Sequence, residues 1–586
     1  MRDVDSNPKW SLPLRAVLSG FVVAFVLIIA ACNGSESTGN EPYYARTEPP
    51  RKQEFRWSNG KLPKTLDPAF AAAPPETDLV RAVFEGLTEL DPQTLEAKPG
   101  VAEKWTPSED LRSWTFHLRA DAKWSNGKPV TAQDFVRSWK RLGELGTAVP
   151  HHDLLANIVG FPIKKKPATV PSTELIPNTN QNIPSHPPPA APLPDSSPGP
   201  APAPFGVVAD DDRTLRVLLV VPDKDLPKLV AHPLFRPIGA ESTEFAVTTT
   251  IVSNGAFRVS ESDASGVTLE PSDSYWNRRA IALERVRMVA AENAEQALAA
   301  YKAGDIDAIT NADFEPLALK LLEPFNDFRR RPHAAVNFYE INHERAPFDD
   351  RRVREALAIA IERERLTEGD MEGTTRPALS FLSFSRDPEA VIVQDISRAR
   401  DLLAEAGYPR GEGFPAIKLV INRNDTQTRV ARAVARMWKQ NLNVETEIVV
   451  KENAEVETAR ITGDFDLIRR NAVFPTADEL MSILTLLKPP VTPPAANATQ
   501  SPEPREGVEA EDSRTPNNAS SPTPSPVESP DVTMSEANAI FELWAIPLYF
   551  PTSYSLVKPY VSGFETNSLD APSLQSVAID SNWQPK

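Results

Sequence analysis

Two long proline-rich stretches interrupt this chain and limit which parts of it can fold together. Residues 162–204 contain Pro187-Pro188-Pro189, and residues 489–530 are rich in Pro, Ser, Thr, Asn and Glu. Neither stretch carries enough apolar side chains to offset the entropy lost on ordering, so both are expected to be disordered inserts. We expect them to act as spacers; the alternative is a ligand for SH3-like partners.

The rest of the chain is long enough for more than one hydrophobic core. The 586 residues exceed the size at which a single core stops growing, and the hydrophobic content of 41% is typical of a globular protein. We therefore expect two or three lobes. The net charge of −17 argues against a nucleic-acid partner, because phosphate binding needs clustered Lys and Arg.

The first 32 residues are typical of an export signal. A basic start (Arg2, Lys9) precedes an uncharged apolar run, 16–31, which ends at Cys32. This ending resembles the lipobox of bacterial lipoproteins, in which the cysteine is diacylated and becomes the new N-terminus. The alternative is an uncleaved membrane helix, although the run is shorter than the roughly 20 residues that a span needs. Residues 33–52 are then expected to form a flexible tether.

Strand and helix patterns alternate between the inserts. Trp114, Phe116 and Leu118 alternate with polar residues, which predicts a half-buried strand. Thr131 and Asp134 have the spacing of a capping pair and predict the start of a helix.

The second half of the chain has the pattern of a βαβ unit with a parallel sheet. Strand patterns at 417–421 and 444–450 flank a helical pattern at 426–442. Gly304 and Gly463 each follow a helical pattern and precede a strand pattern. We interpret these two glycines as equivalent helix-to-strand turns in two halves of one lobe.

Motifs for enzyme chemistry are missing from the sequence. It contains neither a Gly-x-Ser-x-Gly elbow nor a phosphate loop. The pair His151-His152 has no further ligands nearby, and Cys32 is the only cysteine. The repeated Trp-Ser-Asn-Gly-Lys at Trp57 and Trp124 is interpreted as two turns with a packed Trp. We therefore expect neither an enzyme, a metal site nor a cofactor.

A series of short motifs runs through both halves of the chain. They are Pro99–Trp105, Trp114–Arg119, Ala122–Gly127, Pro129–Phe135, Ser253–Phe257, Tyr339–Asn342, Ala346–Asp349, Val353–Leu357, Leu403–Tyr408 and Leu556–Tyr560. Together and in this order they resemble the family 5 extracellular solute-binding proteins, which include the periplasmic oligopeptide- and dipeptide-binding proteins. The resemblance covers roughly Trp57 to Phe564 apart from the two inserts.

The resemblance implies an α/β fold of the bilobal periplasmic-binding-protein type (type II) with an extra lobe. Two chain crossings, near Val289 and Ile546, would form a hinge about which the lobes close. The implied division is 53–80, 205–289 and 546–586 for lobe I, 81–204 with the first insert for lobe II, and 290–545 with the second insert for lobe III.

The resemblance also implies binding rather than catalysis. In this family an extended peptide lies between lobes I and III and is paired through its backbone, as in strand addition. The closed form is then recognised by the permease subunits of an ABC transporter. For this chain we expect a monomeric, extracytoplasmic lipoprotein of the cell envelope that takes a peptide or peptide-like ligand.

Several site residues carry over from the family. Arg460 and Arg469 fall where the family places arginines that meet a peptide carboxylate; the alternative is ion pairs within the protein. Phe257 stands where the family has a Tyr. The other candidates are Asn254, in the same motif as Phe257, and Asn471, Ala472 and Val473, where the family has Gly-Trp-Cys in a binding strand.

The amine end of the implied site departs from the family. Pro475 stands where the family has the Asp that anchors the peptide amine, and Asp478 and Glu479 are the nearest acids that could substitute. Three hypotheses stay open. The protein is a peptide receptor; it binds a modified peptide, a murein fragment, or an opine-like or sugar-linked compound; or it is a non-transporting sensor, chaperone or interaction platform of the envelope.

The export signal gives a first prediction. If Cys32 is acylated, Cys32→Ser releases the protein from the membrane fraction or leaves an uncleaved precursor. Fractionation followed by mass spectrometry of the N-terminal peptide measures this. A variant that is processed and lipid-bound like the wild type would contradict the lipoprotein hypothesis.

Overall fold

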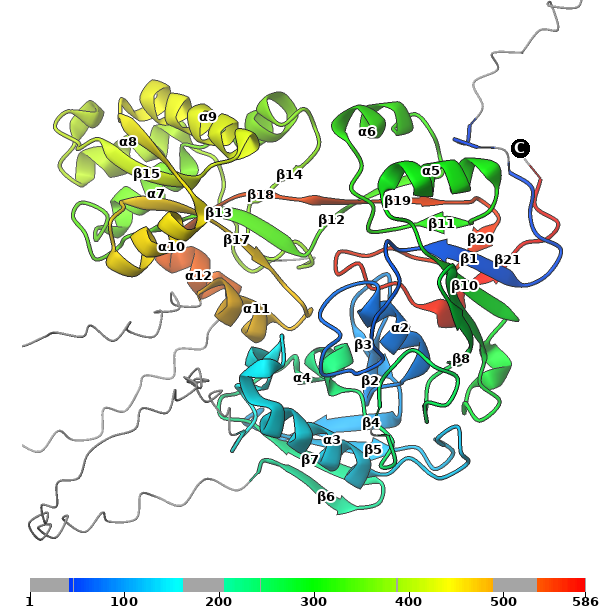
Figure 1. The fold of residues 1–586 in the computed structure, drawn as a ribbon. Coiled ribbons are helices and arrows are strands. Elements are labelled where there is room, and N and C mark those ends of the chain that lie inside the picture. The colour runs from blue at the N-terminus through cyan, green and yellow to red at the C-terminus, as the bar shows by residue number, and fades with distance from the viewer. Residues whose placement is uncertain are drawn as a thin grey trace, which may run out of the picture.

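The computed structural model describes residues 42–45, 47–161, 205–242, 244–385, 388–487 and 535–584. The predicted export signal, Cys32, and the inserts at 162–204 and 489–530 lie outside these residues. Three main sheets organise the described chain (Figure 1). We name the three lobes after them: the seven-stranded, the four-stranded and the six-stranded lobe.

The seven-stranded lobe carries a mixed sheet drawn from distant parts of the chain. Its centre is buried: Phe55 and Trp57 pack against Phe564 at ring-centroid distances of 4.9 and 5.2 Å. The strands, in sheet order, are β12 (Phe328–Pro332), β19 (Thr552–Val557), β11 (Ala308–Ile309), β1 (Glu54–Ser58), β10 (Arg285–Val289), β9 (Gly266–Pro271) and β8 (Phe257–Asp263).

The four-stranded lobe is antiparallel throughout and confirms two local predictions. The predicted strand with Trp114, Phe116 and Leu118 buried is β5, and Thr131 and Asp134 form both halves of a capping box at the start of α3. The strands, in sheet order, are β4 (Ala102–Pro107), β5 (Ser113–Leu118), β7 (Thr214–Leu218) and β6 (Val207–Asp211), with α3 (Ala132–Leu145) beside them.

The six-stranded lobe contains the predicted βαβ unit. Strands β15 and β16 are parallel and are joined by α9 (Asp425–Leu442). Helices cover both faces, because Leu419 packs with α9 whereas Val420 packs with Ala459 of α10 (Asn453–Thr462). The strands, in sheet order, are β14 (Arg376–Pro377), β18 (Ala545–Phe550), β13 (Ala335–Ile341), β17 (Leu467–Val473), β15 (Ile417–Asn422) and β16 (Thr446–Lys451).

A two-stranded ribbon joins the seven-stranded and six-stranded lobes. Strand β12 pairs with β19 in one sheet, and their continuations β13 and β18 pair in the other. Between the sheets, the backbone N–H of His333 donates to the carbonyl of Pro551 at 2.8 Å. The chain therefore passes between the two lobes twice, along neighbouring paths.

The observed boundaries differ from those expected in two places. The first crossing follows β12 and not β10, so α5 (Ala294–Ala303), β11 and β12 belong to the seven-stranded lobe although the expected division began lobe III at residue 290. Strand β7 pairs with β5 and β6 pairs with β7, so both lie in the four-stranded lobe, whereas the expected division placed 205–289 in lobe I. Strand pairing, which the local pattern does not reveal, decides both boundaries.

The two glycine turns have the predicted conformation but lie in different lobes. Gly304 ends α5 and Gly463 ends α10, each with a positive φ in the left-handed region. The strand after Gly304 is β11 of the seven-stranded sheet, and the strand after Gly463 is β17 of the six-stranded sheet. The interpretation as two halves of one lobe was therefore wrong.

The end of the expected tether docks on the seven-stranded lobe. The backbone N–H of Tyr44 donates to Asp327 at 3.0 Å, and the Tyr44 ring lies 5.4 Å from that of Phe325. Ala45 is 5% exposed. Residues 42–45 thus pack against the body of the protein and were not expected to do so.

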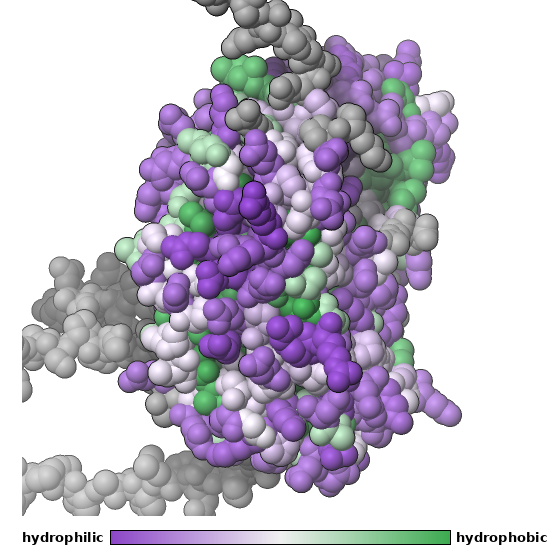
Figure 2. All heavy atoms as spheres, turned by 90° about the vertical axis from the view of Figure 1, so that its right-hand side faces the viewer, coloured by the Kyte–Doolittle hydropathy of each residue, from purple (hydrophilic) through white to green (hydrophobic). Residues whose placement is uncertain are grey.

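The remaining elements connect the three lobes and cover their sheets. No helix among the described ranges is long and apolar enough to cross a membrane. Figure 2 shows one face on which polar side chains predominate and hydrophobic residues lie scattered between them. The elements are α2 (Glu76–Val83), β2 (Thr88–Leu90), β3 (Ala97–Pro99), α4 (Leu226–Leu229), α6 (Pro316–Leu322), α7 (Arg351–Ile359), α8 (Ile396–Glu405), α11 (Glu479–Leu486), α12 (Glu536–Glu542), β20 (Val561–Ser562), β21 (Ala578–Ile579), a π-helical turn at Arg365–Asp370 and short 3-10 turns at Gly146–Ala148, His152–Leu155, Pro233–Phe235, Arg278–Ala280, Pro409–Gly411 and Leu574–Ser576.

Candidate ligand-binding site

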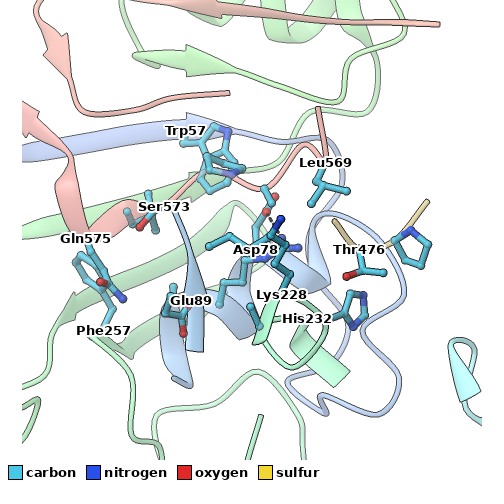
Figure 3. A pocket seen from close by; sticks show the side chains of 18 residues that line it. Trp57, Asp78, Glu89, Lys228, His232, Phe257, Thr476, Leu569, Ser573 and Gln575 are labelled. Atoms are coloured by element: carbon cyan, nitrogen blue, oxygen red, sulfur yellow. Dashed lines mark hydrogen bonds and ion pairs between the residues drawn. The ribbon is translucent and has the colours of Figure 1, made fainter. Parts of the chain in front are cut away.

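A pocket lies where all three lobes meet (Figure 3). It encloses about 670 Å³ of space outside the protein atoms, its open mouth included. Trp57 of β1 and Phe257 of β8 come from the seven-stranded lobe, and Pro475 and Thr476, which follow β17, come from the six-stranded lobe. The other polar and charged side chains of its lining are Asp78, Arg81, Glu89, Lys228, His232, Ser573 and Gln575.

Asp78 and Arg81 lie one turn apart on α2. Arg81 Nη1 donates to Asp78 Oδ1 at 3.1 Å, and Asn59 Nδ2 donates to Asp78 Oδ2 at 3.1 Å. Burial raises the pKa of Asp78 to about 6, and the charge of Arg81 opposes this shift. Burial also lowers the pKa of Arg81. The hydrogen bonds from Arg81 and Asn59 therefore satisfy Asp78 within the protein.

The other ionisable side chains of the pocket are also satisfied. Glu89 Oε2 accepts a hydrogen bond from the buried Arg236 at 2.6 Å. Lys228 Nζ lies 3.1 Å from Glu96 and 3.2 Å from Asp225. His232 Nδ1 accepts from the backbone N–H of Leu234 at 3.1 Å, and burial lowers its pKa well below the ordinary value, so the ring is neutral. Among the described lining residues, no charge is left unpaired.

Asn254 and Phe257 come from one sequence motif, but only Phe257 contributes to the pocket lining. Phe257 lines the pocket as expected. Asn254 is 5% exposed and its amide bonds to the backbone of Glu85, accepting from the N–H at 3.1 Å and donating to the carbonyl at 3.0 Å. Burial and the charge of Glu89 raise the pKa of Glu85 to about 7. Asn254 thus holds the turn after α2 and is not part of the pocket lining.

Strand β17 is paired on one side only along most of its length. It pairs with β13 over all seven residues, from Leu467 to Val473, but with β15 only at Leu467 and Ile468. On the other edge, residues 469–473 therefore have no neighbouring strand among the described residues. Asn471 and Val473 are exposed, whereas Ala472 is 6% exposed and packs in the core. This free edge leads directly to Pro475 and Thr476 of the pocket.

The two candidate arginines are in different electrostatic states. Arg460 forms an ion pair with Glu340 at 3.0 Å, and Glu340 also pairs with Arg470. Arg469 bonds to the amide oxygens of Asn337 and Asn422, and no carboxylate among the described residues pairs with it. Its Nε is buried without a hydrogen-bond partner, and burial lowers its pKa. Arg469 is thus a half-buried cation without its anion.

The acids near Pro475 do not reach the pocket. Asp478 is fully buried, caps the N-terminus of α11 and faces Asp223 of the four-stranded lobe. Glu479 pairs with Lys224 at 2.8 Å. Pro475 itself lines the pocket and supplies no charge. The position of the expected amine anchor is therefore without an acid in this conformation.

Sequence reasoning missed most of the polar lining. The spacing of Asp78 and Arg81 does predict a pair on one face of a helix, because side chains three residues apart are neighbours there. No sequence pattern indicated that Glu89, Lys228 and His232 line a pocket, since their position depends on separate segments meeting in space. Trp57 was interpreted as a packed turn residue, and it is 1% exposed and donates to Thr310 at 2.9 Å while also lining the pocket.

Comparison with known proteins identifies the family. Residues 96–494 match the model of the bacterial extracellular solute-binding proteins, family 5 Middle. This chain belongs to that family. The periplasmic oligopeptide-binding protein OppA of Salmonella typhimurium is 32% identical over 71% of this chain and 74% of that protein. The periplasmic murein peptide-binding protein MppA of Escherichia coli is 30% identical over 88% of this chain and 91% of that protein.

Solved structures confirm the predicted bilobal α/β fold of this family member. The unliganded open form of the murein tripeptide-binding protein MppA has a TM-score of 0.69 at 27% identity, covering 91% of this chain and 98% of that chain. A second structure of MppA, from Escherichia coli, covers 91% and 99% of the two chains at the same identity but has a TM-score of 0.54. By this score the family member described here is more similar to the unliganded open form than to the second MppA structure.

The site geometry predicts that Asn254 supports the fold. Asn254→Ala leaves a buried N–H and a buried carbonyl of Glu85 without partners, so the free energy of unfolding falls by about 2–4 kcal/mol. Asn471→Ala, at an exposed position on β17, changes it by less than about 0.5 kcal/mol. Urea unfolding followed by circular dichroism measures both variants. Equal effects would show that Asn254 does not carry the turn.

Proposed function

We propose that this protein captures peptides between its seven-stranded and six-stranded lobes and delivers them to the permease of an ABC importer. The observation that carries the proposal is the free edge of β17 beside an unneutralised arginine. A strand with one unpaired edge offers backbone N–H and carbonyl groups to an extended peptide, independent of its side chains. The family, and relatives named as oligopeptide- and murein peptide-binding proteins, support this function.

Arg469 is proposed as the partner of a ligand carboxylate. It lies at the start of the free edge of β17 and has no anion of its own among the described residues. A guanidinium that is half-buried and lacks an anion gains a charge-assisted bond when a carboxylate arrives. Arg460 is not proposed for this role, because Glu340 already neutralises it.

The other end of the ligand is proposed to lack a free ammonium. Asp78 and Glu89, the acids of the pocket lining, are each paired with an arginine. Pro475 carries no charge, and Asp478 and Glu479 are engaged elsewhere. An ammonium would therefore be buried without an anion, at a cost of several kcal/mol. A peptide acylated at its amine, or a murein-type fragment joined to sugar there, fits this site best.

The protein is proposed to be an envelope lipoprotein anchored through Cys32. The apolar run ending at Cys32 supports lipidation. Because Tyr44 docks on the seven-stranded lobe, the lipid would hold that lobe close to the bilayer surface. A monomer with one lipid anchor is sufficient for this arrangement.

The charges of the site predict that a free amine on the peptide weakens binding. Isothermal titration calorimetry gives N-acetyl-trialanine a dissociation constant at least about tenfold below that of trialanine, because burying the ammonium without an anion costs several kcal/mol. Tight binding that requires the free amine would contradict the proposal and point to another acid. Binding of neither peptide would favour a non-transporting role in the envelope.

Arg469 gives a second prediction about the same site. Arg469→Ala weakens binding of N-acetyl-trialanine by about 1.5–3 kcal/mol, the strength of a charge-assisted hydrogen bond. Amidating the peptide's carboxyl end weakens binding to the wild type by a similar amount and has little further effect on the variant. Arg460→Ala is the control, since its guanidinium is occupied by Glu340. Equal losses in both variants would show that Arg469 is not the specific anchor.

A further inference from the structure

Two buried acids, Asp223 and Asp478, lie within hydrogen-bonding reach of each other where the four-stranded and six-stranded lobes meet. Asp223 lies in the loop between β7 and α4 and is 3% exposed, and Asp478 at the start of α11 is 0% exposed. One oxygen of each is satisfied: Asp223 Oδ1 accepts from the N–H of Asp225 at 2.8 Å, and Asp478 Oδ1 accepts from the N–H of Met481 at 2.7 Å. The Oδ2 atoms of both are buried, and no donor among the described residues reaches either one.

A single proton shared between the two carboxyl groups is the simplest way to give their Oδ2 atoms a hydrogen bond. Two ionised carboxylates in contact repel each other, and both lose hydration on burial, so one of them is held protonated. Burial and the neighbouring Asp223 raise the pKa of Asp478 well above its ordinary value. Burial also raises the pKa of Asp223, and the hydrogen bond from Asp478 opposes that rise. Both directions are those expected for a proton that Asp478 carries and donates to Asp223.

The surrounding charges do not replace the proton. Lys224, next to Asp223, pairs with Glu479 on the opposite lobe at 2.8 Å. Lys228 pairs with Asp225 and Glu96. Further out, Glu389 interacts electrostatically with Lys224, and Glu536 with Glu479. Both are acids, so neither brings a positive charge to the pair. The indole Nε1 of Trp114 donates to the backbone carbonyl of Asp223 at 3.1 Å and does not reach its carboxyl group.

The contact lies on a surface that moves when the lobes move. Met481 of α11 is 2% exposed and, with Leu484 of the same helix, packs into a hydrophobic core built mainly by the seven-stranded and four-stranded lobes. Because the six-stranded lobe is joined to the seven-stranded lobe by the ribbon of β12–β13 and β18–β19, a rotation about that ribbon displaces α11 from the four-stranded lobe. Such a rotation separates Asp478 from Asp223.

We propose that Asp223 and Asp478 bind one proton between them and so hold the six-stranded lobe against the four-stranded lobe in the observed arrangement. Separating the two acids exposes them to water and releases the proton. The contact is most stable below the ordinary carboxyl pKa of about 3.9, and it loses stability as the pH rises through the raised pKa of the pair. Low pH thus favours the observed arrangement, and high pH frees the six-stranded lobe to move.

Single-molecule fluorescence transfer tests the proposal on the full chain. Cys32→Ser removes the only cysteine, and Lys140→Cys on α3 and Gln440→Cys on α9, both at exposed positions, place one dye on each lobe. Between pH 5 and pH 9 without ligand, the ratio of separated to contacting molecules is expected to rise by up to about tenfold per pH unit, the limit for release of one proton. A ratio independent of pH overturns the proposal.

Matched variants assign the effect to the pair. Asp478→Asn keeps a good helix cap and supplies an N–H to Asp223, so the ratio becomes nearly independent of pH. Glu479→Gln removes a nearby acid but leaves the pair, and its pH dependence matches the wild type. Circular dichroism checks that each variant is folded. An Asp478→Asn chain with the wild-type slope overturns the proposal, as does a ratio that responds to added Ca²⁺ or EDTA and not to pH.

Discussion

The ribbon that joins the seven-stranded and six-stranded lobes determines how these lobes can rotate and where the free edge of β17 lies. Strands β12 and β19 run on into β13 and β18, and each pair is antiparallel, so the crossings at His333 and Pro551 lie next to each other. Two neighbouring crossings permit a rotation between lobes while each sheet stays rigid. The same continuation makes β13 the inner neighbour of β17, whose other edge is free over residues 469–473. The ribbon and the proposed binding edge are thus parts of one sheet.

Several buried charges of the described residues are paired with an opposite charge nearby, and two sites depart from this pattern. Asp78 with Arg81, Glu89 with Arg236, and Arg460 with Glu340 are pairs whose burial is compensated locally. Arg469 and the contact between Asp223 and Asp478 are different, because each leaves a charge or an acceptor without a protein partner among the described residues. We assign the first to a ligand carboxylate and the second to a proton. Both assignments give the uncompensated groups a role in binding or movement.

Local patterns in the sequence predicted local structure well and long-range contacts poorly. The alternation at Trp114 and Phe116, and the capping pair at Thr131 and Asp134, depend on residues a few positions apart, and both predictions were confirmed. The first crossing was placed near Val289, but sheet pairing of β11 and β12 moves it beyond Pro332. Arg460 and Arg469 could not be distinguished from sequence, because Glu340 on β13 neutralises only the first of them.

The central claim is that the chain binds a peptide-like ligand whose carboxylate meets Arg469 and whose amine is blocked. Native mass spectrometry of the full chain, purified without denaturation from the cells that naturally produce it, tests it most directly. The account predicts a bound small molecule that is released on unfolding, does not react with amine-modifying reagents and is lost from Arg469→Ala. A co-purified peptide with a free, reactive amine, retained equally by the variant, would contradict it.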